Sequence, residues 1–372
     1  MIGIITFHSA SNYGAVLQTY ALEQKIQELG GTCEIIDYHC QAIDREYKLI
    51  TKRDFFPIQL KPSYIRNLMM RFVKMRVKHQ KNKKFQAFVK EHLKLSPACY
   101  NSEQLEQLQT RYGAVITGSD QVWNPVLTEA DGAYFLEFVK DNRKKHSYAA
   151  SFGNMGDQFG LDEKYIELLR QFQEISVREQ SGEQYVSEKV KCDSKVHVDP
   201  TLTLNREQWE TMAKRPEESR YLLVYTVCQP LHLLEAAKEI ARKENLKIIY
   251  LNDKMIHRDK EIQYIPSASP EQFVGYFKYA DYVLTNSFHG TVFSVIFKRP
   301  FLVELESSGG KNQRVVDLLF SLKIQNREIR NGSVEQYQEP IDWNQAEERL
   351  DRQKQRAENY LLQVIKNDSM NQ

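Results

Sequence analysis

The chain has 372 residues, and a single hydrophobic core stops growing at roughly 250 to 300 residues, so the length predicts two domains. Hydrophobic residues make up 41% of the chain and charged residues 27%, which is the composition of a globular protein. Because 51 basic residues balance 49 acidic ones, the composition does not indicate a nucleic-acid partner, and any charged ligand has to be inferred from local sequence.

The start of the chain has no basic segment followed by an apolar one, and no apolar run reaches the ~18 residues of a membrane span. We therefore expect a cytoplasmic protein. The five cysteines are odd in number, widely spaced and never arranged as Cys-x-x-Cys, which indicates reduced thiols and no disulfide framework or zinc site.

The first elements predict an N-terminal Rossmann-like domain over residues 1–210. Residues 2–7 are typical of a buried strand, residues 13–29 carry apolar positions at helical spacing, and residues 33–38 are typical of a second strand. The loop after the first strand is small and polar, and it leads to a helix N-terminus, where free N–H groups favour an anion. Asn12 and Gly14 are therefore candidate residues for binding an anionic substrate, with simple capping of the helix by Asn12 as the alternative.

A basic helical insertion is predicted at about residues 44–96. Between residues 61 and 94 it holds eleven lysines or arginines and a single acid, Glu91. A solvated helical face is the favoured interpretation of such a run. The alternative is peripheral attachment of residues 61–94 to an anionic membrane surface or a lipid-linked diphosphate sugar, where each basic residue contributes about 1 kcal/mol.

The sheet resumes with predicted strands at residues 114–117, 146–150, 174–177 and 195–198. Ligands of open α/β sheets bind beyond the carboxyl ends of the strands, so the residues after each strand are site candidates. The first of these strands is followed by an acid, amides and a tryptophan, which suit a sugar with polar hydroxyls and an apolar face. The candidate residues in this loop are Ser119, Asp120, Gln121, Trp123 and Asn124.

Two further strand ends carry charged residues. Arg178 follows the strand at 174–177, and its guanidinium could bind a carboxylate or phosphate through two hydrogen bonds. Asp199 ends the last strand of this domain, where it is either a site residue or the cap of a short helix.

A second Rossmann-like domain is predicted at residues 220–330, after a charged boundary at 205–220. Strands at 221–227, 247–251, 282–285 and 301–304 alternate with helices at 231–244, 270–279 and 291–297. A helix at 340–366 is then expected to pack back across both domains.

The turn from Asn286 to Gly290 in this second domain is the strongest site candidate. His289 lies between a buried strand and a helix N-terminus, where an imidazole with a pKa of about 6.5 can donate or accept a proton. Gly290 lets a backbone come close to a ligand. After the next strand, Lys311 and Arg314 are further candidate cations. The chain has no HExxH motif and no Gly-x-Ser-x-Gly elbow, so we expect neither a metal site nor a serine hydrolase.

These segments together resemble the polysaccharide pyruvyl transferase family: ITFHSASNYGAVLQTYAL, VITGSDQVWNP, SYAASFG, SVRE, VDPTL, TNSFHGTVFSVIFKRPF and KNQRVVDLL. The similarity runs from Ile2 to about Arg327. It implies two Rossmann-like domains in a glycosyltransferase-B-like arrangement. It also implies transfer of a pyruvate ketal from phosphoenolpyruvate, as the co-substrate and without another cofactor, to a sugar or lipid-linked glycan of a cell-surface polysaccharide.

In that reaction we expect His289 to act as the general acid, and Asp120 and Asp199 to orient or deprotonate sugar hydroxyls. Arg178, Arg314, Lys311, Asn12, Gly14, Ser287 and Gly290 would bind the donor, and Ser119, Gln121, Trp123 and Asn124 the acceptor. One position departs from the family pattern, because this chain has Ser287 where the characterised members have an arginine. Two alternatives therefore stay open: a nucleotide-sugar-dependent glycosyltransferase, and a non-catalytic glycan- or nucleotide-binding protein of the same fold.

Overall fold

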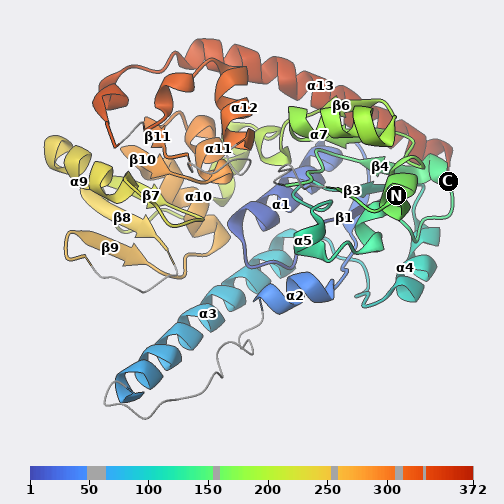
Figure 1. The fold of residues 1–372 in the computed structure, drawn as a ribbon, viewed down its shortest axis with the longest axis horizontal. Coiled ribbons are helices and arrows are strands. Elements are labelled where there is room, and N and C mark those ends of the chain that lie inside the picture. Colours follow the sequence, from blue (N-terminus) through green and yellow to red (C-terminus); the bar gives the residue numbers. More distant parts are fainter. Residues whose placement is uncertain (48–63, 154–159, 253–258, 306–312, 330–331, 372) are drawn as a thin grey trace.

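The structure is a computed structural model that describes residues 1–47, 64–153, 160–252, 259–305, 313–329 and 332–371. Within these residues the chain forms two lobes, each built on a parallel sheet with helices against it (Figure 1). The predicted α/β class is confirmed by these two parallel sheets.

The first lobe contains a parallel sheet in the order β2-β1-β3-β4, and backbone bridges from His146 to Glu174 and from Ala150 to Val177 connect it to the pair β5-β6. Most of these strands are buried along their whole length, as expected for a parallel sheet covered on both faces. The strands are β1 Ile2–Ile5, β2 Cys33–Ile35, β3 Ala114–Thr117, β4 Lys145–Ser147, β5 Ile175–Val177 and β6 Ser194–Val196. The helices are α1 Tyr13–Glu28, α4 Ser102–Leu108, α5 Pro125–Thr128, α6 Glu163–Leu169 and α7 Gln180–Tyr185.

The second lobe contains a parallel sheet in the order β11-β10-β7-β8-β9. Its strands are β7 Tyr221–Tyr225, β8 Lys247–Leu251, β9 Ile262–Ile265, β10 Tyr282–Thr285 and β11 Phe301–Val303. Its helices are α9 Leu233–Glu244, α10 Pro270–Tyr279, α11 Phe288–Ile296 and α12 Gln313–Leu322. Strand β9 was not predicted, because it lies at the sheet edge and only Ile262 of its four residues is buried, which leaves a weak hydrophobic signal.

One hydrophobic cluster spans both lobes, and each lobe has a further cluster of its own. The ring of Tyr13 stacks on Phe273 of the second lobe with 4.3 Å between ring centroids, and its hydroxyl donates a hydrogen bond to the carbonyl of Ala268 at 2.9 Å. Residues 205–220, predicted only as a charged boundary, contain helix α8 Arg206–Met212. Trp209 of this helix is fully buried between the two lobes, and its ring lies 5.0 Å from that of Phe293.

Helix α13, Trp343–Met370, runs from the second lobe across the first, as Figure 1 shows along the upper edge of the molecule. Near its start, Arg349 donates a hydrogen bond to the carbonyl of Ser321 in the last turn of α12. Further along, Glu358 pairs with Lys25 of α1 at 3.0 Å, and the hydroxyl of Tyr360 donates to the carbonyl of Ser147 at the end of β4.

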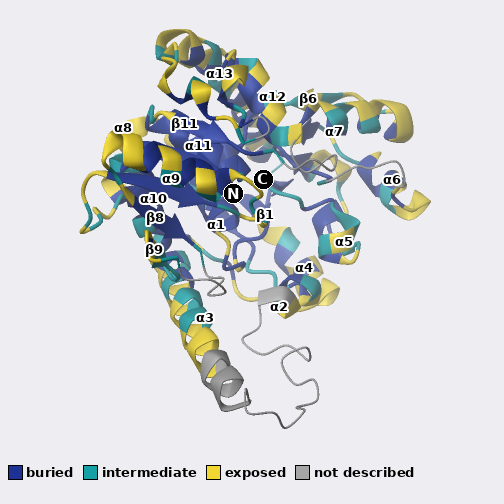
Figure 2. Ribbon diagram, turned by 60° about the vertical axis from the view of Figure 1, so that its left-hand side comes forward, coloured by how far each residue is buried: buried dark blue, intermediate teal, exposed yellow. Residues whose placement is uncertain are grey.

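The basic insertion contains helices α2, Gln41–Tyr47, and α3, Tyr64–His92. The C-terminal part of α3 is held by the buried rings of Phe85 and Phe88, whereas its N-terminal part extends away from both lobes (Figure 2). Within the described residues, no helix combines the length and the hydrophobicity needed to cross a membrane.

Candidate functional site

Residues from both lobes meet around the carboxylate of Asp199. Asp199 follows β6 of the first lobe, whereas His289 lies in the first turn of α11 in the second lobe. The Nε2 atom of His289 lies 3.7 Å from Oδ2 of Asp199, and the same oxygen accepts a hydrogen bond from Nη1 of Arg178 at 2.9 Å. The structure therefore brings together three of the predicted site residues across the contact between the lobes.

Asp199 is fully occupied as a hydrogen-bond acceptor. Its Oδ1 accepts from the backbone N–H and the hydroxyl of Thr201, at 3.0 and 2.6 Å, and its side chain is sealed from solvent. Burial raises the pKa of Asp199, but His289 and Arg178 outweigh burial and hold that pKa well below its usual range. The carboxylate therefore holds His289 and Arg178 together, and the expectation that Asp199 orients or deprotonates sugar hydroxyls stays a prediction.

Arg178 is buried and surrounded by carboxylates. Its guanidinium lies 3.6 Å from Asp120 and 3.7 Å from Glu179, in addition to Asp199. Although burial disfavours the charged form, these three acids raise the pKa of Arg178, so it is a permanent cation. Its Nε and Nη2 atoms and Nε2 of His289 are buried without any hydrogen bond. Unpaired buried donors cost free energy, and a bound anion would satisfy them.

Two guanidinium groups lie over the ring of Phe288. That of Arg178 lies 5.3 Å from the ring centroid, and that of Arg314, in the first turn of α12, lies 5.6 Å from it. Burial, and to a smaller extent the charge of Arg178, lower the pKa of Arg314 to about 10. Phe288 and Glu179 were not predicted as site residues. Both are direct neighbours of predicted ones, Phe288 of His289 and Glu179 of Arg178, and that adjacency was the available signal.

The N-terminus of α1 contacts the imidazole of His289. A Cβ atom at Gly14 would lie 2.2 Å from Nδ1 of His289, so only glycine allows the ring to come this close. The side chain of Asn12 caps α1 and accepts hydrogen bonds from the backbone N–H groups of Gly14 and Ala15, at 2.9 and 3.4 Å. Asn12 therefore caps α1, and Gly14, which has no side chain, leaves the space that the imidazole of His289 occupies.

Helix α11 begins at Phe288, so His289 and Gly290 lie inside the helix and not on a turn before it. Ser287 is its N-cap and accepts a hydrogen bond from the backbone N–H of Gly290. A Cβ atom at Gly290 would lie 2.2 Å from Oγ1 of Thr285. Gly290 is therefore required for close packing of α11 on β10, and the expectation that it approaches a ligand stays a prediction.

Only some of the site residues predicted in the loop after β3 lie beside the cluster around Asp199. Asp120 is half-buried near Arg178, and the amide of Asn124 donates to Oε1 of Gln121 at 3.0 Å. Ser119 is buried, and its hydroxyl donates to the carbonyl of Ala149. Trp123 is fully buried in the core of the first lobe, and its indole N–H donates to the carbonyl of Tyr134. The prediction that Trp123 covers a sugar is wrong, since its ring packs against other aromatic rings. Lys311 lies outside the described residues.

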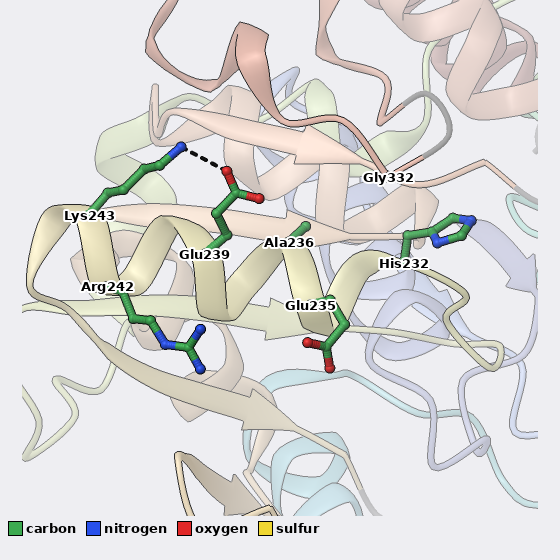
Figure 3. A pocket seen from close by; sticks show the side chains of 7 residues that line it. All are labelled: His232, Glu235, Ala236, Glu239, Arg242, Lys243 and Gly332. Atoms are coloured by element: carbon green, nitrogen blue, oxygen red, sulfur yellow. Dashed lines mark hydrogen bonds and ion pairs between the residues drawn. The ribbon is translucent and has the colours of Figure 1, made fainter.

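A hollow of about 590 Å³ lies on the outer face of α9, with His232 and Gly332 at one end (Figure 3). It is lined by alternating charges such as the ion pair of Lys243 with Glu239 at 2.7 Å, which is typical of a solvated helix face. The N-terminus of α9 is satisfied by the carboxylate of Glu304, which accepts hydrogen bonds from the backbone N–H groups of residues 231–233. This helix end therefore already holds a carboxylate of the chain itself.

One group of side chains in the described part of the chain has the spacing of metal ligands: Glu91, His92 and Glu271. Nζ of Lys214 lies 2.9 Å from the carboxylate of Glu271, so an ammonium group already neutralises its buried member.

Comparison with known families adds one strong match. The family model for polysaccharide pyruvyl transferase matches residues 12–305, which include Arg178, Asp199 and His289. No curated protein matches the chain.

Several solved structures have a similar fold at low sequence identity. UDP-GlcNAc 2-epimerase from Neisseria meningitidis, bound to UDP-GlcNAc, is 10% identical with a TM-score of 0.44, over 97% of this chain and 93% of that one. MnaA from S. aureus, in a structure with UDP, is 12% identical with a TM-score of 0.47, over 96% and 90%. The glycotransferase of kitacinnamycin is 12% identical with a TM-score of 0.43, over 98% of each chain.

Proposed function

Since the chain belongs to the polysaccharide pyruvyl transferase family, we propose that it transfers a pyruvate unit from phosphoenolpyruvate to a sugar of a cell-surface polysaccharide or its precursor, as a ketal. The observation that carries this proposal is the cluster between the lobes. There, buried N–H groups of Arg178 without hydrogen-bond partners lie with the imidazole of His289 around one carboxylate. A cationic donor group and a proton donor held together suit an anionic substrate that has to be protonated.

Phosphoenolpyruvate carries a phosphate and a carboxylate, so its binding requires more than one cation. Arg178 and Arg314 supply two guanidinium groups, and both lie over the ring of Phe288. Ser287 stands where the family likeness implies an arginine, and its hydroxyl caps α11. The position of Arg314 next to Phe288 supports the proposal that it provides the missing charge.

In the proposed reaction, protonated His289 donates its proton to the methylene carbon of phosphoenolpyruvate. The first acceptor hydroxyl attacks the neighbouring carbon and loses its proton, which returns the imidazole to its charged form. The bond from that carbon to the phosphate oxygen then breaks, phosphate leaves, and the second hydroxyl attacks to close the ketal, with its proton leaving with phosphate. Asp199 stabilises the charged imidazole throughout, because its carboxylate stays ionised 3.7 Å away. Asp120, half-buried at the edge of the cluster, is a candidate to orient the acceptor hydroxyls.

The test of this proposal is phosphate release from phosphoenolpyruvate, measured with a broad panel of saccharide acceptors. We expect acceptor-dependent release in the native protein and none in His289→Ala, with phosphoenolpyruvate binding retained in the variant. Absence of release with every acceptor would contradict the proposal. Stabilisation by UDP or GDP sugars, and not by phosphoenolpyruvate, in a thermal-shift experiment would favour a nucleotide-sugar glycosyltransferase. Full activity of His289→Ala would remove the assignment of the acid.

We further propose that α3 places the enzyme at an anionic membrane surface that carries the lipid-linked acceptor. The apolar side chains of Phe72, Val73 and Met75 are exposed, and the basic residues Lys74 and Arg76 lie among them. In the described part of α3 the first acidic residue is Glu91, so every charged residue before it in the helix is basic. Exposed apolar residues beside basic ones favour a membrane interface over a merely solvated face.

Sedimentation with lipid vesicles tests this placement. We expect binding to vesicles with anionic lipid, weakened by salt and by Phe72→Asp, and no binding to neutral vesicles. Equal sedimentation of native protein and Phe72→Asp would contradict it.

A further inference from the structure

A second cavity, of about 650 Å³, lies at the carboxyl end of β1 and β2 in the first lobe. His8 and Ser11 line it from the loop between β1 and α1, Asp37 and His39 from the segment after β2, and Gln86 from α3. Its position is where open parallel sheets bind ligands, and its volume is within the range of about 300 to 1,000 Å³ typical of small-molecule sites. None of these residues belongs to the cluster around Asp199.

The polar side of this cavity is a fixed network. Nε2 of His8 lies 2.8 Å from Oδ1 of Asp37, and Nε2 of His39 lies 3.3 Å from the same oxygen. Nδ1 of His39 lies 3.5 Å from Asp44, and its ring stacks on Tyr100. Although burial opposes ionisation, His39 and His8 hold the pKa of Asp37 well below its usual range. The cavity therefore presents both hydrogen-bond donors and acceptors in set positions.

The apolar part of the lining comes from α3 and its C-terminal end, where Phe85, Val89 and Leu93 line the cavity together with the polar side chains of Asn82, Gln86 and Lys90. Apolar and polar side chains around one cavity match a saccharide ring, which has hydroxyls at its edge and C–H groups on its face.

The cavity and His289 lie on opposite ends of one short segment. Ser11 lines the cavity, and Gly14, three residues later, contacts the imidazole of His289. Three residues span at most about 11 Å, which is of the order of two sugar rings. We propose that this cavity binds a sugar residue of the acceptor next to the one that receives pyruvate, so that the natural acceptor contains at least two sugars. This inference rests on the proposed function.

Filling the cavity tests the inference. Gln86 is an exposed residue of α3 that lines the cavity, whereas Gln80 is an exposed residue of the same helix that does not. We therefore compare Gln86→Trp with Gln80→Trp, and neither side chain is part of a buried core. We expect Gln86→Trp to raise KM for an oligosaccharide acceptor at least about tenfold, with KM for phosphoenolpyruvate unchanged and Gln80→Trp unaffected. Monosaccharide acceptors should have a lower kcat/KM than oligosaccharides and should be insensitive to Gln86→Trp.

Direct binding to a glycan array separates the failure of this inference from the failure of the proposed function. If the native protein releases phosphate and both variants have the same KM for the acceptor, the cavity proposal is overturned and the enzyme proposal stands. If the native protein releases no phosphate but binds glycans, loss of that binding in Gln86→Trp alone supports the cavity. Equal glycan binding by both variants, or no glycan binding by the native protein, overturns it.

Discussion

The contact between Gly14 and His289 makes a quantitative prediction. In Gly14→Ala, the new Cβ would lie 2.2 Å from Nδ1 and 2.4 Å from Cε1 of the imidazole. Non-bonded atoms of this kind pack at about 3.5 Å, so the ring has to retreat by more than about 1 Å. Misplacement of a catalytic group by about 1 Å costs on the order of 100-fold in rate, equivalent to about 2.7 kcal/mol in the activation free energy. We expect kcat to fall by about that factor.

Stability should not fall with it. Gly14 lies in the first turn of α1, where its φ is not in the left-handed region, and alanine favours a helix over glycine by up to about 1 kcal/mol. The assay is phosphate release, with the melting temperature measured in parallel and Gly160→Ala, whose Cβ would meet open space, as the control. A kcat within twofold of the native value would refute the reasoning.

Three further predictions follow from the buried charges. Asp199→Asn should leave a buried guanidinium without its closest partner, and we expect chemical denaturation to show a loss of about 3 to 5 kcal/mol; a loss under 1 kcal/mol would contradict this. Arg314→Ala should raise KM for phosphoenolpyruvate at least about tenfold with little change in the KM of the acceptor, whereas equal changes in both would argue against a donor site. Burial lowers the pKa of His146 and of His197 to about 4, below the unfolded value of about 6.5, so the folded state binds fewer protons in this range. The free energy of unfolding should therefore fall as pH decreases from about 6.5 to 4, by about 3 kcal/mol for each histidine. Burial raises the pKa of Glu23 to about 7, which opposes this trend, but one carboxyl is outweighed by two imidazoles. Denaturation at pH 7 and pH 5 measures the difference, and His146→Leu should remove most of it, because the carboxyl of Glu23 then offsets the one imidazole that remains; an unchanged difference would count against the assignment.

Strands and helices with strong periodicity could be predicted from the sequence. The fully apolar strand β10 and the helix α10 have the predicted bounds, because buried parallel strands and capped helices leave clear signals. The start of α11 was predicted three residues too late, since Ser287 is the cap but glycine at position 290 suggested a turn. In that case tertiary packing against Thr285 outweighed local propensity.

The composition of the site could be predicted only in part. Strand-end position identified Arg178, Asp199 and His289, but not which of them touch, because the contact joins two lobes that are far apart in sequence. Trp123 shows that a residue predicted to contact a ligand can belong to the core. An indole in a polar loop has the same sequence signal whether it faces a ligand or the core, and only its burial in the structure distinguishes the two.

The crossing of α13 over the first lobe has a consequence for biosynthesis. The carbonyl of Ser147 at the end of β4 receives a hydrogen bond from Tyr360, and the buried Lys25 pairs with Glu358. Both partners emerge from the ribosome only after the whole second lobe has been made. The first lobe therefore cannot complete its packing cotranslationally, and its uncovered face is the surface on which we expect a chaperone to act while the nascent chain grows.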